Sequence, residues 1–243
     1  MGKRLIQQAR GKGGPTYRAP SFNYKGEAKV RYNISEAEIK DIVKCRGHSA
    51  PLIEVLYPTE NGTQTGLMIA SEGLRVGQKL QIGSDSVIKN GNVLPLMEIP
   101  EGTRIFNIES VPGDGGKFIR AGGSFGIIVG KTKDGIKVKL PSKKVKVFNI
   151  RCRATIGRVA GSGRKEKPFL KAGNKYYYKK AKNKLYPVVS GTAQNAVDHP
   201  FGNSRSLRKG RSRPISRHAP PGRKVGLISP KQTGRKRGKI EKK

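Results

Sequence analysis

The adjacent residues Asp198 and His199 are the pair in this sequence whose types could support catalysis. A carboxylate beside an imidazole can orient it as a general base, and Ser190 or Ser204 could then act as the nucleophile. However, adjacent side chains in an extended loop point in different directions, and Pro200 favours an extended backbone at His199. We therefore expect no autonomous catalysis; binding contacts are the favoured interpretation, and a structural turn is the alternative.

Two other kinds of site are only partly represented in the sequence. Cys45-x-x-His48 has half of a zinc-site spacing, but no second Cys/His pair follows, and the chain holds only 2 Cys and 3 His. Residues 113–117 could turn backbone N–H groups toward an anion. They lack the βαβ context of a dinucleotide site, and residues 157–165 lack the Gly-Lys-Ser/Thr order of a P-loop. We expect no zinc, no cofactor and no nucleotide hydrolysis.

The charge of the chain is large, positive and unevenly distributed. There are 51 Lys and Arg against 16 Asp and Glu, a formal net charge of +35. Residues 35–115 hold 7 basic and 11 acidic side chains, whereas residues 116–200 hold 21 and 3. Residues 1–34 hold 8 and 1, and residues 201–243 hold 15 and 1. An isolated globule with this charge would repel itself, so we expect a polyanionic partner such as nucleic acid.

The composition also limits the compartment. Two cysteines fit a reducing environment without a disulfide framework. There is no run of about 18 apolar residues, no secretory signal and no basic amphipathic helix for a membrane surface. We expect a cytoplasmic protein without a membrane partner. Hydrophobic residues make up only 34%, so part of the chain should lack a core of its own.

The near-neutral part of the chain reads as short β-strands. Residues 52–57 and 66–70 predict two strands joined by a hairpin turn at Asn61-Gly62. Residues 38–45 are ambiguous because a capping box at residues 35–38 favours a helix, whereas the β-branched residues favour a strand. We predict a strand there, in a small barrel. Residues 94–96 and 99–103 are expected to punctuate short strands, and residues 105–111 alternate as a strand does. Further strands are predicted at residues 126–129, 136–140 and 145–148.

Basic patterns dominate from the middle of the chain onward. Lysines alternate with apolar residues in 136–140 and 145–148, which predicts one buried face and one face that presents ammonium groups to phosphate. Residues 175–180 (KYYYKK) place three tyrosines between cations, a pattern that can stack on bases and bind a backbone. A strand with one buried tyrosine is the alternative. Residues 1–34 and the tail after Gly202 are expected to have no fold of their own, and residues 1–34 to order on nucleic acid or remain a disordered tail.

A series of short motifs runs through the chain, over roughly residues 5–210. The motifs are residues 48–52 (HSAPL), 73–78 (GLRVGQ), 91–96 (GNVLPL), 99–103 (IPEGT), 107–109 (NIE), 112–116 (PGDGG), 120–123 (RAGG), 152–157 (CRATIG), 191–193 (GTA), Asn195 and 197–200 (VDHP). In their sequences and their order these motifs resemble those of a known family, the universal large-subunit ribosomal protein L-two family.

The resemblance implies a mostly β fold, with an OB-fold barrel followed by an SH3-like barrel and extended basic N- and C-terminal segments. We therefore divide the chain into a basic N-terminal extension (1–34), an OB-fold RNA-binding domain (35–83), an SH3-like barrel with basic loops (84–190), and an RNA-penetrating loop with a basic tail (191–243). The resemblance also favours the strand over the helix at residues 38–45.

The resemblance further implies a structural protein of the cytoplasmic large ribosomal subunit, near the peptidyl transferase centre, with roles in subunit association and tRNA binding. The implied partners are large-subunit ribosomal RNA, other ribosomal proteins and the small subunit, with Mg²⁺ as an ion that could bridge protein and RNA. The family usually has a second His where Phe201 stands, so a role that needs this imidazole does not carry over. A chromosomal DNA-binding protein and a hydrolase are the rival interpretations.

These expectations select a set of side chains for contact with RNA. Arginine and lysine neutralise phosphates, and polar groups of the 191–202 loop make particular contacts. The predicted RNA-binding residues are Arg151, Arg153, Lys179, Lys180, Asp198, His199, Arg205, Arg208 and Arg211.

Overall fold

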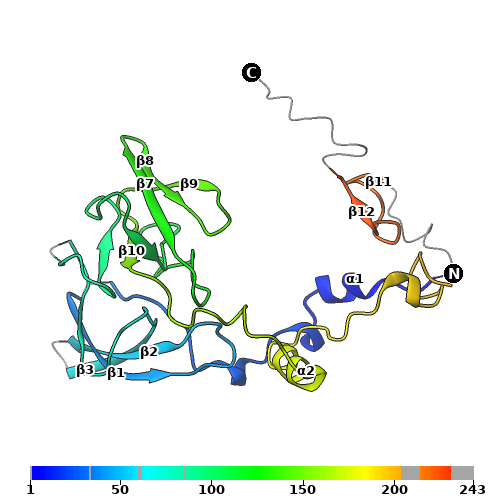
Figure 1. The fold of residues 1–243 in the computed structure, drawn as a ribbon, viewed down its shortest axis with the longest axis horizontal. Coiled ribbons are helices and arrows are strands. Elements are labelled where there is room, and N and C mark those ends of the chain that lie inside the picture. Colours follow the sequence, from blue (N-terminus) through cyan, green and yellow to red (C-terminus); the bar gives the residue numbers. More distant parts are fainter. Residues whose placement is uncertain (1, 33, 60–61, 85, 204–213, 231–243) are drawn as a thin grey trace. The chain divides into compact units, whose positions relative to one another are not determined.

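The computed structural model describes residues 2–32, 34–59, 62–84, 86–203 and 214–230 (Figure 1). Its contacts divide the chain into two compact units. Residues 20–175 form the first, which we call the β unit. Residues 1–19 and 176–243 form the second, which we call the terminal unit. Strands make up 29% and helices 11%, so the predicted mostly β fold is confirmed.

The first sheet of the β unit is antiparallel and contains four strands in the order β3-β2-β1-β4. The strands are β1 (Glu36–Val43), β2 (Leu52–Thr59), β3 (Gly62–Ile69) and β4 (Lys79–Gln81). Leu52 pairs with Ile69 and Thr59 with Gly62, which confirms the predicted hairpin around the turn. Residues 60–61, including Asn61 of that turn, lie outside the described residues.

Most of the ambiguous segment at residues 38–45 belongs to strand β1, which ends at Val43. β1 pairs with β2 on one side and with β4 on the other, and its residues Ala37 and Ile39 are buried. The strand prediction is therefore confirmed. The helix favoured by the capping box is not formed, because two turns of β-branched residues make a marginal helix whereas two flanking strands satisfy the backbone.

The second sheet is also antiparallel, with the strand order β5-β10-β6-β7-β8-β9. In Figure 1, β7, β8 and β9 project away from the β1–β3 sheet. The predicted strand at 105–111 is shorter than expected, because the chain turns at Asn107, where φ is 48°. The strands are β5 (Val93–Pro95), β6 (Arg104–Phe106), β7 (Gly126–Thr132), β8 (Gly135–Lys139), β9 (Val145–Phe148) and β10 (Arg153–Ile156).

The alternation predicted for the two lysine-rich strands is right for β8 and wrong for β9. In β8, Ile136 and Val138 are buried while the lysines are exposed. In β9, Val145 and Val147 are 54% and 47% exposed. Lys146 is exposed as well, but it lies on the same side of the strand as the buried Phe148, and its Nζ is 4.0 Å from the centre of the Phe118 ring. A cation over an aromatic face is attracted by the ring quadrupole, which favours this position of Lys146.

Each sheet has a core, and a third cluster joins them. Tyr57, Leu80 and Met68 belong to the core of the first sheet, and Leu96 and Ile105 to that of the second. The joining cluster consists of Ala28, Cys45, Ala50, Leu52, Ile69, Phe106 and Val159. Within the described residues neither sheet closes on itself by strand pairing. The arrangement agrees with an OB-fold and an SH3-like barrel, while the four-part division of the chain remains a prediction.

Residues 20–32 are ordered by protein contacts, contrary to the expectation that residues 1–34 lack a fold of their own. Ala28 and Val30 are buried, and the backbone N–H of Lys29 donates to the carbonyl of Leu67 at 2.9 Å. Nearby, the Cys45 thiol accepts from the backbone N–H of Lys25 at 3.4 Å. This segment therefore contributes to the β unit rather than forming a separate tail.

The terminal unit is held together by contacts between its two chain segments. The side-chain amide of Asn183 donates to the carbonyls of Thr16 and Arg18, at 2.6 and 2.7 Å. The backbone N–H of Lys3 donates to the carbonyl of Val197 at 2.7 Å. Thus Lys3, near the N-terminus, is hydrogen-bonded to the 191–202 loop, and Asn183 joins residues 16 and 18 to the later segment of the terminal unit.

The remaining elements are short. No helix of the described residues is long and apolar enough to cross a membrane. Beyond Gly202, where no fold was expected, β11 and β12 form a two-residue parallel pair. The remaining elements are α1 (Ile6–Gly11), α2 (Ala172–Lys180), β11 (Pro214–Ile215), β12 (Leu227–Ile228) and the 3₁₀ turns Pro15–Tyr17, Ser21–Asn23 and Gly191–Ala193.

Candidate nucleic-acid interface

The loop of residues 191–202 is closed by its own backbone hydrogen bonds. The N–H groups of Asp198 and His199 donate to the carbonyl of Asn195 at 3.0 and 3.1 Å. The N–H of Gly202 donates to the carbonyl of His199 at 2.8 Å. The loop is therefore a compact local structure of the terminal unit, with a defined shape, rather than an extended connection.

Two glycines make this shape possible because the backbone passes other groups too closely for a side chain. A Cβ atom on Gly191 would overlap the imidazole ring of His199. A Cβ atom on Gly202 would overlap the carbonyl group of Asn195. The second contact is with backbone, which cannot move aside as a side chain can. The Gly-bounded character of the loop seen in the sequence thus has a packing cause.

The loop does not arrange Asp198 and His199 as a catalytic pair. The Nδ1 atom of His199 accepts from the backbone N–H of Phe201 at 3.0 Å, and the carboxylate of Asp198 lies 3.8 Å from the Nζ of Lys3. The hydroxyl of Ser190 bonds to that of Thr192 at 3.0 Å. Ser204 lies outside the described residues. In the part of the chain that the structure describes, Ser190, Asp198 and His199 therefore contact other groups and do not form the hydrogen bonds of a Ser-His-Asp triad.

His199 lies at the edge of a cavity of the terminal unit. The cavity has a volume of about 620 Å³ and contains apolar and cationic groups as well as the loop. The aromatic ring of Phe201 lies 5.2 Å from that of His199, between ring centres. The lining side chains include Ile6, Val188 and Val189, the cations Arg4 and Arg10, and Asn195, Asp198 and His199. Apolar walls with cations at the rim fit the base and the phosphate of a nucleotide.

Lys179 and Lys180 lie in helix α2, so the alternative of a strand with one buried tyrosine is wrong. Tyr177 is 70% exposed, and Tyr176 and Tyr178 are each more than 40% exposed. The Nζ of Lys180 is 5.9 Å from the centre of the Tyr176 ring. Exposed rings interleaved with cations can stack on bases while binding phosphates, as predicted for this stretch. Whether they contact RNA remains a prediction.

Arg151 and Arg153, which the sequence treats alike, have different environments. Arg151 is exposed. Arg153 is half-buried, with its guanidinium carbon 4.2 Å from the centre of the Tyr32 ring. Its Nη1 atom is buried and has no hydrogen-bond partner among the described residues. Arg153 therefore has an internal packing role that the sequence did not predict, and its contact with RNA remains a prediction.

The glycine-rich stretch 113–117 binds the protein's own carboxylates rather than offering N–H groups to a ligand. The N–H groups of Gly113 and Gly115 donate to the buried Glu109 at 3.4 and 3.3 Å. That of Gly116 donates to Asp114 at 2.9 Å. Burial alone would raise the pKa of Asp114, but the N–H groups of Gly116, Ser110 and Val111 and the nearby Lys117 lower it. The anion pocket considered from the sequence is thus already filled.

The remaining predicted residues are outside the described part of the chain or form no site there. Arg205, Arg208 and Arg211 lie outside the described residues. Cys45 and His48 do approach each other, with 3.1 Å between Sγ and Nδ1. No cluster of three or more His, Cys, Asp or Glu side chains able to hold a metal is present among the described residues.

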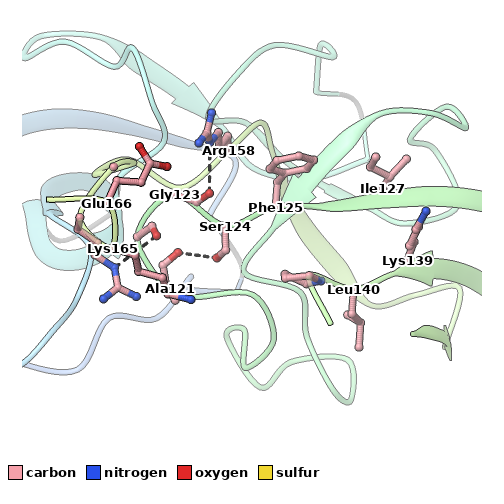
Figure 2. Close-up of a pocket in the computed structure, with 14 residues that line it drawn as sticks. Ala121, Gly123, Ser124, Phe125, Ile127, Lys139, Leu140, Arg158, Lys165 and Glu166 are labelled. Carbon is pink, nitrogen blue, oxygen red and sulfur yellow. Dashed lines mark hydrogen bonds between the residues drawn. The ribbon is translucent and has the colours of Figure 1, made fainter. Parts of the chain in front are cut away.

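Sequence reasoning missed a cavity of the β unit that is centred on Phe125 (Figure 2). Two arginines lie near this ring, with the guanidinium carbon of Arg104 5.0 Å and that of Arg158 5.9 Å from its centre. Arg104, Phe125 and Arg158 come from three separate stretches. Only the glycines at 122 and 123 could have signalled a close approach of the backbone.

Comparison with known proteins connects these features to a family. Residues 89–220 match the family described as Ribosomal Proteins L2, C-terminal domain. The chain belongs to this family. Its L2 relatives match almost throughout: a protein of Methanothermobacter thermautotrophicus is 48% identical over 98% of this chain and 100% of its own length. A protein of Methanocaldococcus jannaschii is 50% identical over 96% of this chain and 99% of its own.

Both relatives are called large ribosomal subunit protein uL2. A third protein of that name, from Methanococcus vannielii, is 49% identical over 97% of this chain and its entire own length. The L2 match at residues 89–220 includes all six strands of the second sheet, helix α2 and the 191–202 loop. The resemblance seen in the sequence motifs is therefore confirmed.

Proposed function

We propose that this chain is a structural constituent of the cytoplasmic large ribosomal subunit. The observation that carries the proposal is the similarity over nearly the full length to proteins of this name, 48% identity over 98% of this chain in one case. Both units of the chain fall within that match, so the proposal concerns the whole described architecture rather than one shared barrel.

The finer part of the proposal is that the chain binds large-subunit ribosomal RNA near the peptidyl transferase centre. Its net charge of +35 calls for a polyanion, and the exposed cations of α2 and the terminal unit are accompanied by rings that can stack on bases. The β unit would fix orientation, and phosphate contacts would supply most of the affinity.

The 191–202 loop would make the particular contacts. Its backbone is closed on itself, and the Nδ1 of His199 is occupied by the N–H of Phe201. The Nε2 edge of the same ring is left for a hydroxyl, base or phosphate of RNA. Through such contacts the chain would support subunit association and tRNA binding, and would touch other ribosomal proteins and the small subunit. Mg²⁺ that bridges protein and RNA remains a prediction.

Sedimentation of the native chain from a cell extract tests this proposal. The extract is separated on a gradient that resolves the ribosomal subunits, after a high-salt wash. We expect the chain to remain in the large-subunit fraction. Release into soluble or DNA-bound fractions would contradict the proposal, and a preference for duplex DNA over structured RNA at moderate salt would favour a chromosomal role. Turnover by the RNA-free protein would favour an enzyme.

A further inference from the structure

The β unit contains a cavity with a volume of about 400 Å³ that is lined by Phe125. This is near the lower end of the range of small-ligand sites, so it suits one small planar group rather than a helix. Figure 2 shows Phe125 between Arg158 and the strand residues Ile127 and Lys139, with the loop of residues 121–124 beside them. Residues 163–166 also line the cavity, and Figure 2 shows Lys165 and Glu166 on the side of the 121–124 loop away from Phe125.

The loop that forms one wall is held rigidly by neighbouring backbone. The N–H of Gly123 donates to the carbonyl of Val159 at 3.0 Å, and the N–H of Val159 donates to the carbonyl of Ser124 at 3.1 Å. A Cβ atom on Gly122 would lie 2.7 Å from the carbonyl oxygen of Ser49. One on Gly123, where φ is +73°, would lie 2.7 Å from the Cα of Ser162. The wall is thus positioned before any ligand arrives.

The chemistry inside the cavity is aromatic and cationic. The ring of Phe125 is only half-buried, and the guanidinium groups of Arg104 and Arg158 lie near it. Arg158 is fixed in place, since its Nε donates to the carbonyl of Gly123 at 3.2 Å and lies 3.7 Å from a carboxylate oxygen of Glu72. An aromatic ring beside a fixed, planar guanidinium is a surface on which a nucleobase can stack.

The rim of the cavity adds positive charge next to the aromatic ring. Lys139, Arg164 and Lys165 line it and are exposed, whereas Glu166 is the acidic residue of the lining. The Nε of Arg164 donates to the carbonyl of Gly122 at 3.5 Å, so its stem follows the loop wall. Cations outnumber acids here, so the rim favours an anionic group next to the aromatic cavity.

We propose that the Phe125 cavity receives one unpaired nucleotide of the RNA, with its base against Phe125 and its flanking phosphates on Lys139, Arg164 and Lys165. The proposal rests on the proposed function, because the RNA supplies the nucleotide. The site lies within the β unit, and its lining includes no residue of the 191–202 loop and none of the predicted RNA-binding residues. The same side chains would also suit a free mononucleotide. The experiment distinguishes binding of a free mononucleotide from binding of a nucleotide within the RNA.

The experiment measures binding of the full-length protein to transcribed large-subunit ribosomal RNA as a function of salt. Phe125→Leu removes the ring and keeps an apolar side chain, Phe125→Tyr keeps the ring, and Phe22→Leu changes an 86% exposed phenylalanine outside the cavity. Arg164→Gln removes a rim charge, with Lys133→Gln as the exposed control outside it. Circular dichroism and thermal unfolding of each variant establish that it is folded.

We expect Phe125→Leu to raise Kd about 5- to 100-fold, the range of base–aromatic stacking, without changing the salt slope. Phe125→Tyr and Phe22→Leu should bind as the wild-type protein does. Arg164→Gln should instead flatten the slope of log K against log salt by roughly one phosphate contact, about 0.7 to 0.9, and more than Lys133→Gln does. Chemical probing of the RNA should show one nucleotide whose protection is lost in Phe125→Leu.

The outcomes separate this proposal from the proposed function. If the wild-type protein binds the RNA and Phe125→Leu has the same Kd and the same protected nucleotides, the cavity does not hold a nucleotide and this inference is wrong. If the wild-type protein does not bind the RNA at all, the proposed function itself fails. Binding of free AMP or UMP to the wild-type protein, lost in Phe125→Leu without any change in RNA protection, would replace RNA by a free nucleotide as the ligand.

Discussion

Replacing the buried Glu109 by glutamine should destabilise the β unit far more than the same change at an exposed position. Its side chain is 1% exposed and accepts four hydrogen bonds. The short ones come from the backbone N–H of Arg153 at 2.8 Å and the hydroxyl of Tyr32 at 2.9 Å. The other two come from Gly113 and Gly115. Glutamine has nearly the same size, so the change opens no cavity.

The expected magnitude follows from the chemistry of this acceptor. A hydrogen bond to a charged group contributes roughly 1.5–3 kcal/mol, and the two long bonds contribute less. An amide keeps one oxygen, which can accept from Tyr32 and Arg153 without the charge. It also turns an NH₂ group toward the N–H of Gly115, where two donors would face each other. We therefore expect Glu109→Gln to lower the free energy of unfolding by about 2–4 kcal/mol, which is a large share of the roughly 5–15 kcal/mol by which proteins are typically stable.

Urea unfolding of the full chain, followed by circular dichroism at low ionic strength, measures this loss. Glu101→Gln is the matched control, because Glu101 is exposed and accepts one hydrogen bond, from the N–H of Lys131 at 3.0 Å. It should lower the free energy of unfolding by less than about 1 kcal/mol. If Glu109→Gln and Glu101→Gln agree within about 0.5 kcal/mol, the reasoning that Glu109 holds the 113–116 loop is refuted.

Four further outcomes are expected. Burial raises the pKa of Tyr57 to about 12, so the contribution of its neutral side chain to the free energy of unfolding is complete below about pH 10 and is lost as pH rises toward 12. Urea unfolding at several pH values should show that this loss of stability is smaller in Tyr57→Phe than in the wild-type protein, and unchanged in the exposed control Tyr177→Phe. Gly202→Ala should speed proteolysis of the 191–202 loop several-fold, whereas Gly222→Ala, with open space around it, should not; equal rates would contradict the packing argument. His199→Ala should weaken ribosome function and leave the thermal unfolding of the β unit unchanged; unfolding of the isolated protein would make His199 a core residue. Deleting residues 203–243 should flatten the salt dependence of RNA binding, because 15 basic side chains are lost, and an unchanged slope would mean few phosphate contacts in the tail.

The strands were predictable because their signals are local. Alternating apolar residues, the Asn-Gly turn and the β-branched run at β1 each act over a few residues, and the structure contains strands at these places. Even there, two local signals conflicted at β1, and pairing with β2 and β4 decided between them. The alternation of residues along a strand determines which side chains share a face of the sheet, but it does not determine which of the two faces is buried.

The features that sequence missed depend on contacts between distant segments. Lys146 lies over the ring of Phe118, 28 positions earlier, and no local pattern predicts that neighbour. Arg153 differs from Arg151 because Tyr32 is brought beside it by the packing of residues 20–32 on the β unit. Arg104 from β6 and Arg158, which follows β10, both lie near the ring of Phe125, which precedes β7, because β6 pairs with β10 on one side and with β7 on the other.

The distribution of acids explains how so basic a chain can still have a folded part. Residues 35–115 hold 11 of the 16 acidic side chains, and Glu109 and Asp114 among them bind the backbone N–H groups of one loop. Even if every Asp and Glu were paired with a cation, 35 Lys and Arg would remain without an acidic partner. These surplus cations lie mostly beyond residue 115, in the part that contains α2 and the 191–202 loop. The near-neutral segment thus folds with little charge repulsion, whereas the surplus positive charge calls for a polyanion, which the proposed ribosomal RNA partner would supply.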